Sequence, residues 1–186
     1  RAALLCPMSL VAQTQLIAGM KRGQVHTFAL EPASATMKPK ARRELPALLN
    51  GVTIFLTSQE ELKNLFWGDT HDLWKMAEMV SIYGPEYVVI KCGESGQLLY
   101  DVKTKRKWEV PAYPARVSDP TGVGDAFNGG FLAGYCKAYD PIEGVLYGNI
   151  SASLKIEGSG AYYPLDVMPG LAEARLHVLR DRVREV

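Results

Sequence analysis

The sequence predicts an α/β fold, a three-layer sandwich with a mostly parallel central sheet, built as a single domain over residues 1–186. Short apolar segments alternate with helical patterns, which is typical of βαβ units. The apolar segments show no alternation with polar residues, so we expect strands that helices cover on both faces. A chain of 186 residues that is 47% hydrophobic and 22% charged can bury one core of this kind.

The first half of the chain carries four expected strands and three expected helical crossovers. We expect the strands at residues 2–6, 25–30, 52–56 and 87–91. The crossovers should lie near residues 10–20, 40–49 and 60–83, each between two consecutive strands.

The second half begins with an expected β-hairpin and continues with helices. Residues 97–101 and 106–110 are two short strands joined by a tight turn. Pro111 and Pro114 then disfavour a helix until Asp119. From residue 123 a helix is expected, because Phe127, Phe131 and Tyr135 recur every four positions. Further helices are expected at residues 142–156 and 166–182.

A stripe of small residues lies on the same expected helix, at Ala126, Gly130 and Gly134. Small residues let another backbone approach closely, at a cost in intrinsic helix stability. We therefore expect tight packing at this stripe, with packing of the helix on the sheet as the preferred explanation.

Composition and charge exclude several classes of function. A net charge of +1 without a basic stripe argues against a nucleic-acid partner, and no segment approaches the roughly 20 apolar residues of a membrane span. The three cysteines, Cys6, Cys92 and Cys136, are far apart and lack a CxxC spacing, and the three histidines are scattered. This pattern predicts neither disulfides nor a zinc site and favours a reducing, cytoplasmic location.

The clearest motif is the glycine turn DPTGVGD at residues 119–125, which stands directly before the expected aromatic helix. The amides of Gly122, Val123 and Gly124 should point outward at the positive end of the helix dipole. Glycines at 122 and 124 permit close approach of a ligand, so the turn predicts an anion site suited to phosphate.

Asp125 is unusual in such a turn, because a carboxylate repels the anion that the amides attract. An acidic residue in a first helical turn stabilises that turn, which explains most aspartates so placed. A carboxylate beside a transferring phosphoryl group can also accept the proton of an attacking hydroxyl. Glycine spacing alone leaves both interpretations open.

The longer run VPAYPARVSDPTGVGDAFNGGFLAG at residues 110–134 closely resembles the signature of the ribokinase-like carbohydrate and nucleoside kinases, the phosphofructokinase-B family. Neither a P-loop nor G-x-G-x-x-G is present. Residues 88–96, VVIKCGESG, and residues 53–61, TIFLTSQEE, are similar to the family's strand with its glycine turn and to its N-E-x-E segment. Residues 149–161, NISASLKIEGSGA, resemble the helix and loop beside its adenine pocket.

The resemblance implies a kinase that moves the terminal phosphate of ATP to a hydroxyl of a sugar or related small molecule. Asp125 would be the general base, and the amides of residues 122–124 would form the anion hole. Glu61 would act on Mg²⁺ through water. Lys91, Gly93, Gly96, Asn149 and Gly160 would lie around the nucleotide. Asp119 and Thr121 match positions that in some members bind a monovalent cation such as K⁺ through the backbone.

The sequence departs from the family pattern in two respects. Ser58 and Gln59 replace the Asn and Glu that begin the N-E-x-E segment, which puts the affinity for metal in question. No counterpart of the family's N-terminal part and lid is recognised, so the chain is expected to be the C-terminal, nucleotide-binding portion. The alternative is a non-catalytic relative that binds a nucleotide or a partner. The identity of the acceptor and a homodimeric state stay open.

Overall fold

The computed structural model describes the backbone of residues 1–186 and every side chain except that of Pro169. The contacts divide the chain into two compact units. Unit 1 comprises Arg1–Cys92 and Tyr100–Lys107, and unit 2 comprises Gly93–Leu99 and Trp108–Val186. In hydrogen-bonding order the strands run β1-β2-β3-β4-β5-β6-β7, which is also their order in the sequence. The expectation of a single domain stays a prediction.

Unit 1 contains four parallel strands that form the first part of the sheet. They are β1 (Ala2–Leu5), β2 (Thr27–Leu30), β3 (Ile54–Ser58) and β4 (Tyr87–Lys91). In the β3–β4 pairing, Ser58 lies opposite Lys91 at the carboxyl end. The central residues of β3 and β4 are fully buried without alternation, as expected for parallel strands. The four strand predictions are therefore confirmed to within two residues at each end.

The helices of unit 1 differ from the sequence predictions in two places. They are α1 (Leu10–Lys21), η1 (Ser34–Thr36), η2 (Pro39–Arg43), α2 (Leu45–Leu49), α3 (Gln59–Leu65) and α4 (Leu73–Ser81). The helix expected at residues 40–49 is a 3₁₀ turn followed by a short α-helix. The helix expected at residues 60–83 is broken, because Gly68 adopts a φ of 84° and Asp72 caps a new helix by accepting from the Trp74 amide at 2.9 Å.

The hairpin strands β5 (Gln97–Asp101) and β6 (Lys107–Val110) contribute residues to both units. The Asp101 amide donates to the Arg106 carbonyl at 3.0 Å, which closes the expected hairpin. Strand β7 (Arg184–Glu185) pairs antiparallel with β6 in unit 2. The sequence pattern did not predict β7, because two charged residues carry no strand signal.

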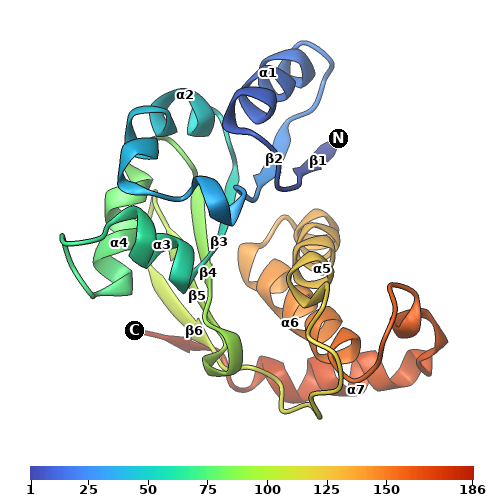
Figure 1. Ribbon diagram of the computed structural model, residues 1–186. Coiled ribbons are helices and arrows are strands. Elements are labelled where there is room, and N and C mark those ends of the chain that lie inside the picture. Colours follow the sequence, from blue (N-terminus) through green and yellow to red (C-terminus); the bar gives the residue numbers. More distant parts are fainter. The chain divides into compact units, whose positions relative to one another are not determined.

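Unit 2 is built mainly of helices (Figure 1). It contains η3 (Gly93–Ser95), α5 (Val123–Ala138), α6 (Pro141–Lys155), η4 (Tyr163–Asp166) and α7 (Pro169–Arg180). Helix α5 begins at the predicted residue. Its aromatic side chains Phe127, Phe131 and Tyr135 are buried, with ring centroids 6.2 and 6.3 Å apart, so the predicted aromatic stripe is confirmed.

The small-residue stripe of α5 packs against helix α6, not against the sheet as preferred from the sequence. A Cβ atom on Gly130 would lie 2.7 Å from the Tyr147 carbonyl oxygen, and one on Gly134 would lie 2.6 Å from the Glu143 carbonyl oxygen. Gly148 of α6 in turn accommodates Phe127. Tight packing is confirmed, and the close pair of helices supports the glycine turn from which α5 starts.

Candidate functional site

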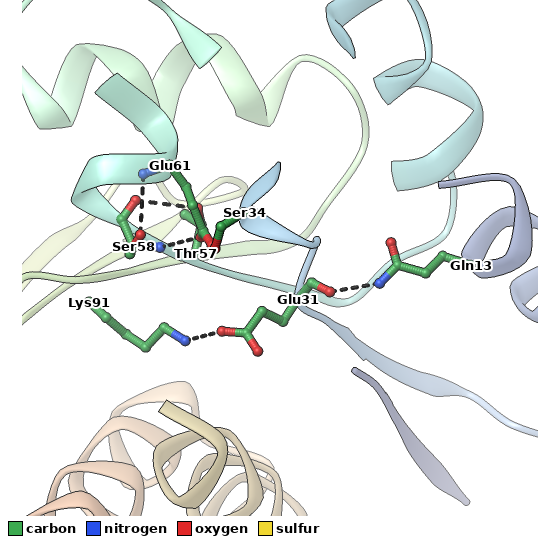
Figure 2. Close-up of polar contacts among 7 residues, drawn as sticks. All are labelled: Gln13, Glu31, Ser34, Thr57, Ser58, Glu61 and Lys91. Atoms are coloured by element: carbon green, nitrogen blue, oxygen red, sulfur yellow. Dashed lines mark hydrogen bonds and ion pairs between the residues drawn. The ribbon is translucent and has the colours of Figure 1, made fainter. Parts of the chain in front are cut away.

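Unit 1 gathers seven polar side chains at the carboxyl ends of its parallel strands (Figure 2). We call this group the strand-end cluster. Its members are Gln13, Glu31, Ser34, Thr57, Ser58, Glu61 and Lys91. Open α/β sheets place ligands outside this end of their strands, so the cluster lies where the fold predicts a binding site.

Glu61 anchors the strand-end cluster and is only 6% exposed. Ser58 caps helix α3 by accepting from the Glu61 amide at 3.2 Å, and the Glu61 carboxylate accepts from the Ser58 amide at 2.8 Å. This is a complete capping box. The hydroxyls of Thr57 and Ser34 also donate to the carboxylate. Ser58, a departure from the family pattern, thus has a clear structural role.

These contacts limit how Glu61 can serve a magnesium ion. An ionised carboxylate has about four lone-pair directions, and three hydrogen bonds already occupy three of them. One direction remains, which fits contact through a water molecule and excludes a bidentate bond. Mg²⁺ commonly keeps several waters and is held by one or two carboxylates together with substrate phosphates. Among the described residues no group of three or more His, Cys, Asp or Glu side chains could hold a metal by itself.

Lys91 ends strand β4 and forms an ion pair with Glu31, which directly follows strand β2 (Figure 2). Both side chains are largely buried. The Gln13 side chain donates to the Glu31 carbonyl at 2.6 Å and to the Cys6 carbonyl at 3.0 Å, which fixes the backbone at Glu31. The predicted nucleotide contact Lys91 is therefore held beside a carboxylate that the sequence did not single out.

The glycine turn of unit 2 contains one left-handed glycine, and one of the three amides predicted to face a ligand is paired within the turn. Gly122 is the N-cap of α5 and adopts the left-handed region, with a φ of 76°. A side chain other than hydrogen would be strained there. The Val123 amide donates to the Pro120 carbonyl at 3.3 Å, and the Gly122 carbonyl accepts from Ala126 at 2.9 Å. Val123 therefore closes the turn, and its amide is less free for a ligand than expected.

The two aspartates at the ends of the turn, Asp119 and Asp125, differ in their hydrogen bonding. Asp119 accepts from the Thr121 amide at 2.9 Å. The hydrogen bonds from the backbone and side chain of Thr121 hold the pKa of Asp119 below its ordinary value, and Ser159 and Lys155 act in the same direction. Asp125 lies in the first turn of α5 and is exposed. An exposed carboxylate at a helix start can stabilise the helix and still meet a substrate.

The three glycines predicted around the nucleotide fall into two kinds. Gly96 has a φ of 94°, and a Cβ there would lie 2.1 Å from the Val110 carbonyl oxygen, so its backbone conformation and its packing both require glycine without any ligand. Gly93 and Gly160 also have positive φ, of 59° and 87°, but no atom lies within 4 Å of their Cβ positions. Open space at Gly93 and Gly160 leaves their backbone accessible to a ligand.

Asn149 is buried in helix α6, and its side chain makes three hydrogen bonds within the chain. Its amide nitrogen donates to the Gln97 side chain at 2.6 Å and to the Pro111 carbonyl at 2.9 Å, and its oxygen accepts from the Tyr113 amide at 2.9 Å. Both donors are thus used within the chain. Any contact of Asn149 with a nucleotide is restricted to its remaining acceptor lone pair.

Each unit holds its own share of the predicted residues. In unit 1, Glu61 and Lys91 belong to the strand-end cluster. Unit 2 holds the glycine turn with Asp119, Thr121 and Asp125, and also Gly93, Gly96, Asn149 and Gly160.

Sequence reasoning missed Glu31 and Lys155. Glu31 directly follows an apolar strand, and this position at a carboxyl strand end was a usable signal. Lys155 ends helix α6, where a basic residue is common, so no signal marked it.

A mostly parallel sheet with helices places the molecule in the class of open-sheet α/β proteins. Within the described residues, none of the helices has both the length and the apolar character that crossing a membrane requires. Comparison with known proteins assigns the chain to one family of such proteins.

Residues 3–168 match the pfkB family carbohydrate kinase model, and the chain belongs to this family. It is 37% identical over 118 residues to an uncharacterized sugar kinase of Archaeoglobus fulgidus, covering 63% of this chain and 45% of that protein. It is 34% identical over 116 residues to the cytidine kinase of Thermococcus kodakarensis, covering 62% and 41%. The chain thus spans less than half the length of these relatives.

A solved structure of Arabidopsis thaliana ribokinase complexed with ribose and ATP superimposes with a TM-score of 0.75 at 20% identity, covering 94% of this chain and 55% of that one. At this identity the likeness establishes the fold alone. The ribokinase-like α/β fold predicted from the sequence is confirmed.

Proposed function

We propose that the chain is the ATP-binding part of a kinase that transfers the terminal phosphoryl group of ATP to a hydroxyl of a sugar or nucleoside. Membership of the pfkB family supports this function. The relatives from Archaeoglobus and Thermococcus are named as a sugar kinase and a cytidine kinase. The plant structure of the same fold was determined with ribose and ATP.

The observation that carries the proposal is the combination of a left-handed Gly122 with an exposed Asp125 at the start of α5. In the proposed reaction the acceptor oxygen forms a bond to the γ-phosphorus, and the bond from that phosphorus to the ADP oxygen breaks. The hydroxyl proton passes to the Asp125 carboxylate as the new bond forms. The backbone amides at Gly122 and Gly124 and the helix dipole stabilise the charge on the transferring group.

Other residues of the chain take supporting roles in this proposal. Lys91 contributes a positive charge at the end of β4, where it is already oriented by Glu31. The open backbones at Gly93 and Gly160 allow the nucleotide to approach. Glu61 would contact Mg²⁺ through water, and that ion supplies neutralisation of the phosphate charge when it is bound.

The test is ADP release by the protein expressed from its complete reading frame, measured with Mg²⁺, ATP and a panel of sugars and nucleosides. The proposal expects at least one acceptor to raise ADP release well above the rate without acceptor. Tight binding of ATP with no acceptor-dependent release across the whole panel would instead support a non-catalytic role.

A further inference from the structure

A buried lysine lies beside the glycine turn of unit 2. Lys155, the last residue of α6, is 4% exposed, although lysine is almost never fully buried unless it is paired. Its Cε atom lies 3.7 Å from the position that a Cβ would take on Gly122. The Asp125 Oδ2 atom lies 4.0 Å from the same position, so both side chains lie close to the N-cap of α5.

The backbone holds Lys155 and the turn together. The amides of Ser118 and Asp119 both donate to the Ile156 carbonyl, at 2.8 and 3.1 Å. The Lys155 ammonium donates to the Gly158 carbonyl at 3.1 Å. The segment after α6 therefore fastens the start of the turn and also supplies an oxygen to the ammonium. Burial and these contacts leave the lysine little freedom to turn away into solvent.

The position of Lys155 bears on whether the turn needs a cation from outside the chain. Asp119 and Thr121 are the residues for which the family resemblance implies a monovalent cation. A cation of that kind needs carbonyl oxygens, and here a carbonyl oxygen next to the turn already binds an ammonium.

We propose that Lys155 supplies, from within the chain, the positive charge that a monovalent metal ion would bring to this turn. A lysine ammonium is a compact single positive charge with three donors, so it can satisfy carbonyl oxygens as such an ion does. A second cation beside it would be repelled. The glycine turn then has its own positive charge beside it, and neither its stability nor the activity of the protein depends on K⁺.

Thermal unfolding of the full chain tests this independently of any catalytic activity. The midpoint is measured in potassium chloride and in tetramethylammonium chloride at equal ionic strength. For the unmodified protein we expect the same midpoint in both salts. For Lys155→Met in tetramethylammonium chloride we expect a lower midpoint than that of the unmodified protein. With K⁺ the midpoint of this variant should rise saturably by about 2–4 °C, because the ion can enter the site that the lysine leaves. Lys137→Met is the matched control, since Lys137 is exposed and the charge change is the same.

A potassium-specific stabilisation of the unmodified protein would overturn the proposal, and so would a folded Lys155→Met variant without a response to K⁺. If Lys155→Met does not fold, Lys155→Gln, which keeps a polar group of similar length, takes its place. A second arm measures ADP release in the two salts and rests on the proposed kinase function. Absence of ADP release in every condition would contradict that function and leave the unfolding result to decide the role of Lys155.

Discussion

The predicted site residues differ in exposure and hydrogen bonding between the strand-end cluster of unit 1 and the glycine turn of unit 2. In the cluster, the Glu61 carboxylate accepts three hydrogen bonds, and Lys91 is paired with Glu31. At the turn, Asp125 is exposed, and Gly122 is open apart from the flanking side chains of Lys155 and Asp125. The carboxylates and the lysine of the cluster are thus satisfied within the chain, whereas the Asp125 carboxylate at the turn is exposed to solvent.

Because of this difference, substitutions in the two regions should affect different quantities, stability in the cluster and turnover at the turn. Removing a buried, satisfied carboxylate leaves unpaired donors and lowers stability. Removing an exposed carboxylate costs little stability, so a loss of turnover there reports chemistry alone. The two regions can therefore be separated by measuring stability and turnover on the same variants.

The largest effect is expected from Asp125→Asn in the glycine turn. Turnover should fall by roughly 10²–10⁴-fold, because an amide cannot accept the proton of the acceptor hydroxyl. Affinity for ATP should stay similar or rise slightly, since one negative charge near the phosphates is removed. Steady-state kinetics and calorimetric titration with ATP measure the two quantities.

The control for this variant is Asp181→Asn, an exposed aspartate at the end of α7. It should leave turnover and the unfolding midpoint unchanged. Normal turnover of Asp125→Asn with a confirmed acceptor would reduce Asp125 to a helix-stabilising residue and remove the proposed mechanism.

The next effect concerns the helix pair that supports the turn. Gly130→Ala should lower the free energy of unfolding by about 1–3 kcal/mol, because its Cβ would lie 2.3 Å from the Ser151 hydroxyl and 2.7 Å from the Tyr147 carbonyl. Gly129→Ala is the matched control. No atom lies within 4 Å of its Cβ position, so alanine should stabilise α5 by about 0.5–1 kcal/mol. Equal effects in urea unfolding would contradict the close approach of α5 and α6.

A smaller loss of stability is expected in the strand-end cluster. Glu61→Gln weakens the capping box and two hydroxyl contacts, so unfolding should become easier by about 1–2 kcal/mol. Glu60→Gln, in the same helical turn but exposed, should change stability by less than about 0.5 kcal/mol. The proposed magnesium role adds a second expectation, a higher Mg²⁺ concentration for half-maximal turnover in Glu61→Gln alone. An unchanged unfolding free energy would mean that the capping box contributes nothing.

Sequence reasoning predicted the parallel strands and helix α5 well, because both have strong local signals. Apolar runs mark β3 and β4, and the four-residue recurrence of aromatics marks α5. The break near Gly68 and the strand β7 were missed, since a capped interruption and a two-residue charged strand leave almost no periodicity.

For the candidate site, sequence reasoning singled out the glycine turn, because the pattern of glycines directly before a helix is local. It overlooked the S-x-x-E pattern of Ser58 and Glu61, which is a local signal for the capping box. It could not show that Asn149 is already bonded within the chain, or that Lys155 lies against Gly122, because these contacts join residues that are far apart in sequence. Only the packed structure brings them together.

The smallest expected effect is a pH dependence of the unfolding free energy that comes from Cys92. It tests whether water reaches the interior next to the strand-end cluster. Cys92 follows Lys91 and is 7% exposed. Burial, together with the charge of Glu60, raises the pKa of the Cys92 thiol from 9.0 to about 11, while Lys63 acts in the opposite direction. Between these two pH values the unfolded chain loses the thiol proton and the folded chain keeps it. Stability from this group is therefore complete below pH 9 and is lost as the pH rises toward 11.

The unfolding free energy, compared with that of Cys92→Ala, should fall by about 1 kcal/mol between neutral pH and pH 10. Lysines and tyrosines that titrate in the same range contribute equally to both proteins and cancel in the difference. Thiol labelling at pH 8 gives an independent check, because exposed Cys6 should react at once and Cys92 only at the rate of opening. Rapid labelling of Cys92, or a pH-independent difference between the two proteins, would show that water reaches the end of β4. The proposed difference between a cluster that excludes water and a turn that is exposed to it would then be wrong.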